Sequence, residues 1–291
     1  MTLITLGAGE REAPVKKRNF TWTLSLPAVV LLAVVCVVPL VVLFALSFVE
    51  GGQPTLAHYT RILTSPAYLT ILQTTFALSV GVMVLAVLLG YPLCYFIVNL
   101  PEKWRPLALA LVSLPLWTSI LVRTFAWQIL LQRRGVINSV LMDLGVIQQP
   151  LQLAFTIWGA MLGMLHIVLP LFVLPVYVAM TQINRRLLQA ALSLGASNTR
   201  VFWTVFAPLT VPGVAAGMLI VFIYALGFYI TPEILGGGKV ITVSMKVAEN
   251  ATMYSEWGAA SSLGAVLLIV AGLAIGLSSK IGKLLSSGGR K

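Results

Sequence analysis

Charged side chains are scarce in this sequence, at 9% of its 291 residues. A soluble domain of this length carries roughly a quarter charged residues. Acidic residues are scarcest, with 8 Asp and Glu against 19 Lys and Arg, whereas hydrophobic residues make up 59%. The composition therefore excludes an ordinary soluble domain and predicts an integral membrane protein.

Residue types that carry catalysis are almost absent too. The chain has only 2 histidines and 2 cysteines, with no HExxH or GxSxG motif and no Asp–His pair placed for acid–base work. The nearest match to a phosphate-binding loop, LGGGKVIT (235–242), lacks the first glycine and has Val240 where the motif needs Ser or Thr. We therefore expect no catalytic residue, no metal site and no cofactor in this chain.

Long apolar runs are what the chain has instead. Their lengths and their lack of period-two alternation favour membrane helices over barrel strands, since about 20 residues suffice to cross the hydrocarbon core. Both cysteines, Cys36 and Cys94, fall in such runs, where packing is expected rather than a disulfide. The predicted fold is all-α, with six transmembrane helices in residues 22–284 between terminal tails at 1–21 and 285–291. The predicted spans are 22–48, 69–98, 106–131, 154–180, 212–235 and 259–284.

The basic residues are divided unequally between the two sides of this arrangement. Counting along the chain, 13 fall on the side of the amino terminus, 5 on the other side, and Arg123 within a span. The positive-inside rule then predicts that both termini and the loop 183–211 are cytoplasmic. The basic residues form no single face and no nucleic-acid motif, so nucleic acid is not an expected partner.

Shorter features complete the predicted organisation. HYTRIL (58–63) and the segment 133–150 are expected to form short helices lying on the membrane surface. Small-xxx-small spacings allow the backbones of neighbouring helices to approach closely. They occur at Gly159/Gly163, Gly213/Gly217 and Gly272/Gly276.

Arg123 is the most informative polar residue within a span. A charged side chain at mid-membrane costs at least about 2.5–3.5 kcal/mol, so Arg123 is expected to have a specific partner or a function that offsets this cost. On a helix, Ser119, Arg123 and Trp127 would share one stripe, with Thr124 and Gln128 beside it. Two interpretations stay open: the guanidinium reaches the outer interface or pairs with a carbonyl or carboxylate, or it lines a solute pathway.

Other polar residues of the membrane region carry similar alternatives. Pro232 is predicted to break the fifth helix beside Glu233, which either lines a cavity or is an interfacial carboxylate facing water. His166, alone within the fourth span, is more typical of a hydrogen-bonded packing residue. The candidate pathway residues are Trp117, Arg123, Trp127, Tyr224, Tyr229 and Glu233.

A polar segment, QAALSLGASNTRVFWTVFAPLTVPG (189–213), interrupts the apolar sequence before the fifth span. It resembles the cytoplasmic EAA loop of ABC importer permeases, E-A-A-x3-G-x9-I-x-L-P. The spacing is intact, but Gln189 replaces Glu, Val205 replaces Ile and Ala207 replaces Leu. The change at Gln189 puts in doubt any charged contact made by that Glu.

The resemblance implies a mechanical role for this loop. Two short helices joined at Gly195 would seat in a cleft of a separate ATPase, with the alanine pair allowing close approach. Pro208 and Pro212 are predicted to end the second short helix and to make the turn into the fifth span. The candidate coupling residues are Gln189, Ala190, Ala191, Gly195, Ala196, Val205 and Pro208.

Two further stretches resemble one branch of these permeases in particular. PLWTSILVRTFAWQILLQRRGVIN (115–138) and GFYITPEILGG (227–237) are similar to the spermidine/putrescine-type branch of these permeases. That likeness implies the transmembrane domain of a type I ABC importer in the bacterial cytoplasmic membrane. It also implies three partners: two ATPase subunits that bind ATP and magnesium, a second related permease or a second copy of this chain, and an extracytoplasmic solute-binding protein.

The solute is left open by these residues. Glu233 and the tryptophans suit the ammonium groups of a polyamine, since aromatic faces attract cations. Arg123 suits an anionic or zwitterionic solute such as an opine, an amino-acid derivative or a phosphonate. The alternative function is a stand-alone secondary transporter, which would predict inverted-repeat halves and intramembrane acidic groups, and neither is visible.

Overall fold

The computed structural model describes residues 20–288, with side chains from Leu26 to Lys280. The predicted tails 1–21 and 285–291 therefore fall mostly outside the described residues. The chain divides into two compact units, one ending at Leu43 and the other beginning at Phe44. The first is the helix α1 (Phe20–Leu46) up to Leu43, which has a mean hydropathy of 3.3 and no buried residue along its apolar window.

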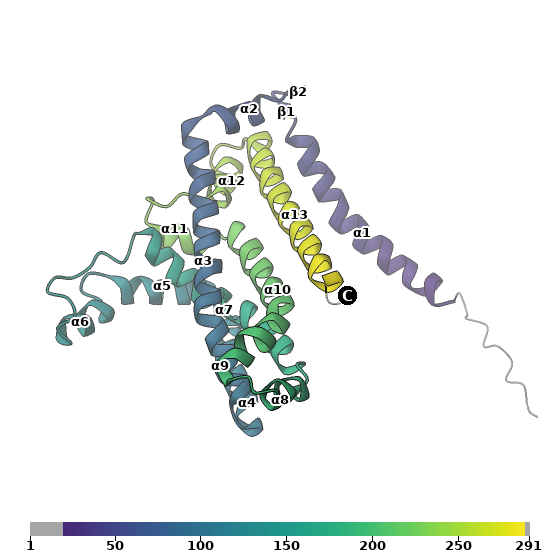
Figure 1. Cartoon of the computed structure of the whole chain (residues 1–291). Coiled ribbons are helices and arrows are strands. Elements are labelled where there is room, and N and C mark those ends of the chain that lie inside the picture. The colour runs from purple at the N-terminus through teal and green to yellow at the C-terminus, as the bar shows by residue number, and fades with distance from the viewer. Residues whose placement is uncertain (1–19, 289–291) are drawn as a thin grey trace, which may run out of the picture. The chain divides into compact units, whose positions relative to one another are not determined.

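The second unit is a helical bundle with one short hairpin (Figure 1). Five helices of the described chain, α1 included, are long and apolar enough to cross a membrane, and six if one bent pair counts as a single span. The expected surface helices 58–63 and 133–150 correspond to α2 and α6. After α1 the elements are β1 (Val49–Glu50), β2 (Gln53–Pro54), α2 (Ala57–Thr64), α3 (Pro66–Asn99), η1 (Glu102–Trp104), α4 (Arg105–Ser113), η2 (Leu114–Trp117), α5 (Ile120–Leu131), α6 (Val136–Asp143), α7 (Ile157–Thr181), α8 (Arg185–Ser193), α9 (Asn198–Val201), η3 (Phe202–Phe206), α10 (Ala207–Leu226), α11 (Ile230–Gly236), α12 (Val243–Thr252) and α13 (Trp257–Gly288).

The core of this unit lies between α3, α7 and α10. Phe172 of α7 is fully buried between glycines of the two other helices. A Cβ added at Gly217 would lie 2.9 Å from the Phe172 ring, and one at Gly90 would lie 2.5 Å from it. The three helices therefore pack closely only because glycine stands at these positions.

The predicted glycine pairs differ in their use. Gly213 and Gly217 both contact α7, and Gly163 contacts Leu235 and Thr231 of α11, as close helix packing requires. Within the described residues, nothing lies within 4 Å of a Cβ built at Gly272 or Gly276. That pair on α13 therefore makes no close contact inside this chain.

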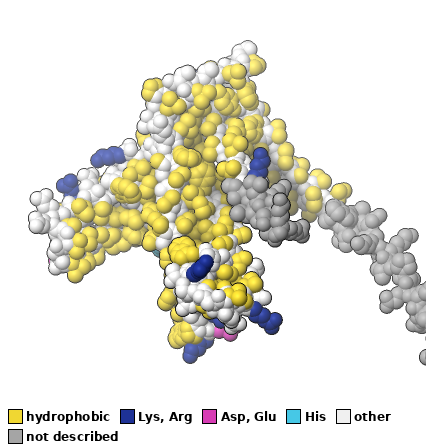
Figure 2. Space-filling view, in the orientation of Figure 1, with side chains coloured by type: hydrophobic (Ala, Val, Ile, Leu, Met, Phe, Trp, Pro, Cys, Tyr) yellow, Lys and Arg dark blue, Asp and Glu magenta, His cyan; other side chains and the backbone are white. Residues whose placement is uncertain are grey.

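The surface of the second unit matches a membrane environment. Apolar side chains cover its middle, whereas Lys and Arg gather at the end formed by α4 and α8 (Figure 2). Large exposed hydrophobic residues occur along α3, α10 and α13, including Leu88, Ile220 and Leu273. Apolar residues in such numbers on an outer face fit contact with lipid rather than water.

The third predicted span, 106–131, is compatible with one broken span, but it is not one continuous helix. The segments Glu102–Trp117 and Ile120–Asp143 meet at an angle of 98°. Thr118 and Ser119 are extended between them, directly after a 3-10 turn that contains Pro115. The expected helical stripe from Ser119 to Trp127 was wrong, because hydropathy does not register a break made by two extended residues.

The fifth predicted span, 212–235, is wrong at both of its ends. The helical run begins at Asn198, and α10 stops at Leu226. Gly227 to Tyr229 then separate it from α11. The predicted break at Pro232 does not occur, because Pro232 lies in the first turn of α11, where its missing N–H has no acceptor to lose.

Candidate functional site

The loop between α7 and α10 is built from local capping contacts. The Asn184 side chain accepts from the backbone N–H of Arg186 at 3.0 Å, and this starts α8. At the other end, Gly195 N donates to Leu192 O at 2.9 Å and Ala196 N donates to Ala191 O at 3.2 Å. This pair of bonds is a Schellman motif, whose turning residue is left-handed.

Gly195 is that turning residue, with φ +85°. A left-handed backbone costs a residue with a side chain about 1–2 kcal/mol. Nothing lies within 4 Å of a Cβ built there, so the requirement for glycine is set by the backbone and not by crowding. The four-residue spacing from Ala191 to Gly195 is therefore the geometry of the helix end.

The second short helix continues into α10. Ser197 caps α9, its hydroxyl accepting from Arg200 N at 3.3 Å. A π-helical turn, η3, follows, in which Ala207 N donates to Phe202 O, and the run continues to Leu226. Pro208 and Pro212 thus end no helix. Pro208 is tolerated because it lies in the first turn of α10, directly after the π turn.

All seven predicted coupling residues lie on this one loop or at its junction with α10. Gln189, Ala190, Gly195 and Pro208 are exposed, whereas Ala191, Ala196 and Val205 are half-buried. Leu194 beside the turn is 88% exposed. The loop thus presents small and apolar surface with no cover in the described chain.

An aromatic cluster joins this loop to α3, and the sequence interpretation missed it. Phe202 and Phe206 of η3 stack with ring centroids 5.7 Å apart. Tyr95 of α3 meets their edges at 5.3 and 5.4 Å, and Tyr91 meets Phe202 at 6.4 Å. The Tyr91 hydroxyl also lies 3.1 Å from that of Thr210. These separations fall in the range at which aromatic pairs attract.

The break at Thr118 and Ser119 involves Arg123. Its Nη2 donates to the Thr118 carbonyl oxygen at 3.0 Å. Its Nε and Nη1 atoms are buried and have no acceptor in the described part of the chain. Ser119 is the N-cap of α5 and does not belong to a helical stripe. Of the two interpretations, pairing with a carbonyl is the one whose contact is present.

The neighbours of Arg123 along α5 join the packed core. Thr124 and Thr231 are buried, with hydroxyl oxygens 3.0 Å apart. Because the Thr124 hydroxyl donates to Ile120 O at 2.8 Å, Thr231 is the donor between them. The indole N–H of Trp127 donates to His166 Nδ1 at 3.1 Å, so His166 is the hydrogen-bonded packing residue expected for the fourth span.

The remaining pathway candidates are exposed. Trp117 is 90% exposed, Tyr224 44% and Tyr229 39%. Glu233 is also exposed, and the pKa of Tyr229 is raised first by a side-chain hydrogen bond to Glu233, then by the partial burial of Tyr229 and by the charge of Glu233. Tyr229 and Glu233 are therefore neighbours across the first turn of α11.

The predicted pathway set is thus only partly brought together. Tyr229 and Glu233 form one pair, and Arg123 lies within electrostatic range of Tyr224. Trp127 belongs with His166 in the core. Among the described residues, no group of three or more His, Cys, Asp or Glu could hold a metal ion.

The stretch 115–138 contains a residue, Asn138, whose structural role the sequence pattern did not predict. Asn138 is fully buried, and its amide donates to Gln132 O at 3.0 Å and Leu151 O at 2.9 Å while accepting from Leu151 N at 2.9 Å. It therefore fixes the segment between α5 and α7. The signal available in the sequence was weak, since Asn138 shares α6 with the polar residues Ser139 and Asp143.

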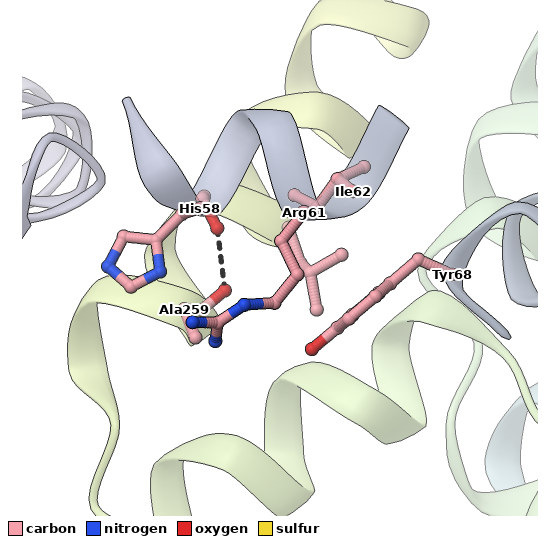
Figure 3. Close-up of a pocket in the computed structure, with 7 residues that line it drawn as sticks. His58, Arg61, Ile62, Tyr68 and Ala259 are labelled. Carbon is pink, nitrogen blue, oxygen red and sulfur yellow. Dashed lines mark hydrogen bonds between the residues drawn. The ribbon is translucent and has the colours of Figure 1, made fainter. Parts of the chain in front are cut away.

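Another cluster of polar side chains lies between α2 and α13. Figure 3 shows the Arg61 side chain between His58 and the Tyr68 ring. The pocket they line is too narrow to admit water. Arg61 pairs with Glu50 at 3.3 Å, and both are more than 40% exposed, so the pair contributes little stability. Nothing in this pocket forms a binding site.

Comparison with known proteins places the chain among transport permeases. It matches the family described as "Binding-protein-dependent transport system inner membrane component" over residues 13–281. It is 35% identical over 234 residues to the spermidine/putrescine transport system permease protein PotB of Escherichia coli, covering 80% of this chain and 84% of PotB. PotB of Haemophilus influenzae is 32% identical over 232 residues, covering 80% and 81%.

A solved structure supports the fold. A chain of a bacterial alginate ABC transporter, in complex with its alginate pentasaccharide-bound periplasmic protein, superposes with a TM-score of 0.73. The match covers 92% of this chain and 96% of that one at 17% identity. At that identity the likeness establishes the arrangement of helices only.

Proposed function

We propose, on the premise that this chain belongs to the binding-protein-dependent transport system inner membrane component family, that it carries a polyamine across the bacterial cytoplasmic membrane. As a multi-pass permease subunit of an ABC importer, it is not a stand-alone secondary transporter. The observation that carries the choice of solute is the identity of 35% to a spermidine/putrescine permease across four fifths of the chain.

The exposed residues of α10 and α11 support a cationic solute. Glu233 supplies a carboxylate, and Tyr229 and Tyr224 supply aromatic faces that attract ammonium groups. Trp117 adds a fourth exposed side chain on the far side of the break at residues 118–119. The positive charge of Arg123 counts against a polyamine, since its hydrogen bond to the neutral Thr118 carbonyl leaves the charge in place.

The assembly we propose has two ATPase subunits, two permease subunits and a solute-binding protein. Two ATPase subunits bind ATP and magnesium, this chain pairs with a related permease or with a second copy of itself, and a solute-binding protein delivers the polyamine from outside. Both termini and the loop 183–211 then face the cytoplasm, as the distribution of basic residues favours.

The α8–α9 loop is proposed as the place where the ATPase acts. Gln189, Ala190, Ala191, Gly195 and Ala196 form or border the helix end that would seat in its cleft. Val205 and Pro208 join that end to α10. The exposed, uncovered apolar surface at Leu194 supports a protein partner there.

Uptake by the complete transporter in liposomes tests the solute. Labelled spermidine should enter in an ATP-dependent way when the binding protein is present. Glu233→Gln should raise the KM for spermidine about two- to fivefold, because an exposed ion pair contributes about 0.2–1 kcal/mol. Glu256→Gln, which also removes an exposed carboxylate, is the matched control and should leave the KM unchanged. Absence of spermidine uptake by the unaltered transporter would refute the proposal that the solute is a polyamine.

A further inference from the structure

The helix α3 is a single run of 34 residues, and its two ends contact different parts of the molecule. Figure 1 shows it extending from α2 at one end to α4 and the α8–α9 loop at the other. Tyr91 and Tyr95 lie near the loop end, and Thr75 lies 16 residues before Tyr91. At 1.5 Å per residue, Thr75 and Tyr91 are about 24 Å apart along the axis.

At the loop end, α3 is attached by side chains on two successive helical turns. Tyr95 packs edge-on against both stacked rings of the π turn, Phe202 and Phe206. Tyr91 adds an edge contact to Phe202 and a hydroxyl contact of 3.1 Å to Thr210. A displacement of the α8–α9 loop that moves the π turn must therefore either carry α3 along or break this cluster.

At the other end, α3 is attached to the break between α10 and α11. Thr75 is 2% exposed, its hydroxyl donates to Ile71 O at 2.8 Å, and its oxygen accepts from the backbone N–H of Val243 at 2.9 Å. The next residue, Ser244, donates to Phe228 O at 2.7 Å. Phe228 is the middle residue of the break 227–229, a place where a helix can hinge.

We propose that α3 is a connecting rod that carries movement of the α8–α9 loop to the hinge at residues 227–229. The loop is attached to one end of the rod by aromatic contacts among Tyr91, Tyr95, Phe202 and Phe206. Thr75, through the first turn of α12, holds the hinge at the other end. All of these are positioning residues, and the proposal rests on the coupling role proposed for the loop.

A fluorescent label at the hinge tests the rod without reference to any solute. Gly227 is exposed and has open space around it, so Gly227→Cys can carry the label in a Cys36→Ser/Cys94→Ala background. In the complete reconstituted transporter, ATP should change the fluorescence of this label. Phe202→Leu, which keeps an apolar side chain but removes the ring, should reduce the change about fivefold or more while ATP hydrolysis continues.

Two controls separate the rod from general damage. Trp203 neighbours Phe202 but is 67% exposed, so Trp203→Leu should leave the signal unchanged. Phe202→Tyr, which retains the ring, should restore it. The rod is refuted if Phe202→Leu keeps the full signal, or if Trp203→Leu reduces it equally.

The far end gives an independent test. Thr75→Val has nearly the same shape but no acceptor for Val243, and it should reduce the signal as Phe202→Leu does. Because both act on one rod, the double variant should be no worse than the stronger single variant. Additive losses would contradict the proposal.

A failure of the rod is distinct from a failure of the coupling loop. Gly195→Trp alters the loop itself and should abolish the signal. If it does so while Phe202→Leu has no effect, the rod fails and the loop keeps its role. If Gly195→Trp has no effect, the role proposed for the loop fails first.

Discussion

The α8–α9 loop and the α5–α11 region are both polar interruptions in an apolar chain, but they are held in different ways. In the loop, Asn184, Gly195 and Ser197 satisfy the backbone through neighbours within five residues. In the α5–α11 region, Thr124 needs Thr231 from 107 positions further along the chain, and Trp127 needs His166. The backbone of the loop is thus held locally, and its attachment to the bundle is made by Phe202 and Phe206, whereas the α5–α11 region is part of the core.

The largest effect is expected where the loop is altered at its contact surface. Ala191→Glu places a charge beside the Gly195 turn, and transport should fall at least about fivefold because the coupling free energy is typically about 1–3 kcal/mol. Membrane insertion and ATP hydrolysis should be retained, since no core contact changes. Ser193→Glu, at a neighbouring exposed position of α8, is the comparison; a normal transport rate in Ala191→Glu would contradict the coupling role.

Arg123→Ala should have the next largest effect, and on stability. It leaves the Thr118 carbonyl without its charged donor, which costs about 1.5–3 kcal/mol. Thermal unfolding of the purified complex measures the loss, and Arg123→Lys should recover part of it. A variant that keeps its melting temperature but loses transport would instead place Arg123 on the solute pathway.

Thr124→Val should destabilise the α5–α11 region by about 1–3 kcal/mol, because Thr231 is left as a buried donor without its acceptor. Removing both hydroxyls in Thr124→Val/Thr231→Val should cost less than the single change. The comparison of the two melting temperatures decides this: a double variant less stable than the single one contradicts the pairing.

Ser197→Ala should have the smallest effect, about 1 kcal/mol, because it removes one helix cap. Hydrogen exchange should quicken at the amides of α9 and leave those of α5 unchanged. Thr199→Ala, in the same helix but without a capping bond, is the matched control. Faster exchange in α5 would mean that the two regions are not independent.

The same difference explains what could be predicted from the sequence. The loop was recognisable by its resemblance to the EAA motif, and the spacing from Ala191 to Gly195 in that motif is the spacing of one helix end. The number of spans follows from hydropathy in the same way. The break at Thr118 and Ser119 was not predicted, since hydropathy does not register two extended residues and the helix after the break is held by Thr231, 107 positions from Thr124.

Prediction also failed where the decisive contact joins distant segments. Phe202 and Tyr95 are ordinary aromatic residues in sequence, and only the fold brings their rings to 5.3 Å. Pro208, Pro212 and Pro232 were interpreted as helix breaks, but Pro208 and Pro232 lie in the first turns of α10 and α11, and α10 continues through Pro212 in its interior. A proline lacks the backbone N–H, and this costs a hydrogen bond only when the proline lies beyond the first turn of the helix. The sequence alone does not show where that first turn lies.

The π turn at Phe202–Phe206 has a further consequence for the attachment of the loop. It places one more residue in that turn than an α-helix would hold, and each residue of an α-helix accounts for about 100° of rotation. Because that turn closes five residues back, from Ala207 N to Phe202 O, it absorbs the extra residue within one wider turn, and the helices before and after it keep nearly the same rotational phase. The extra residue therefore widens the turn that holds Phe202 and Phe206 against Tyr95, without rotating α8 about the axis of α10.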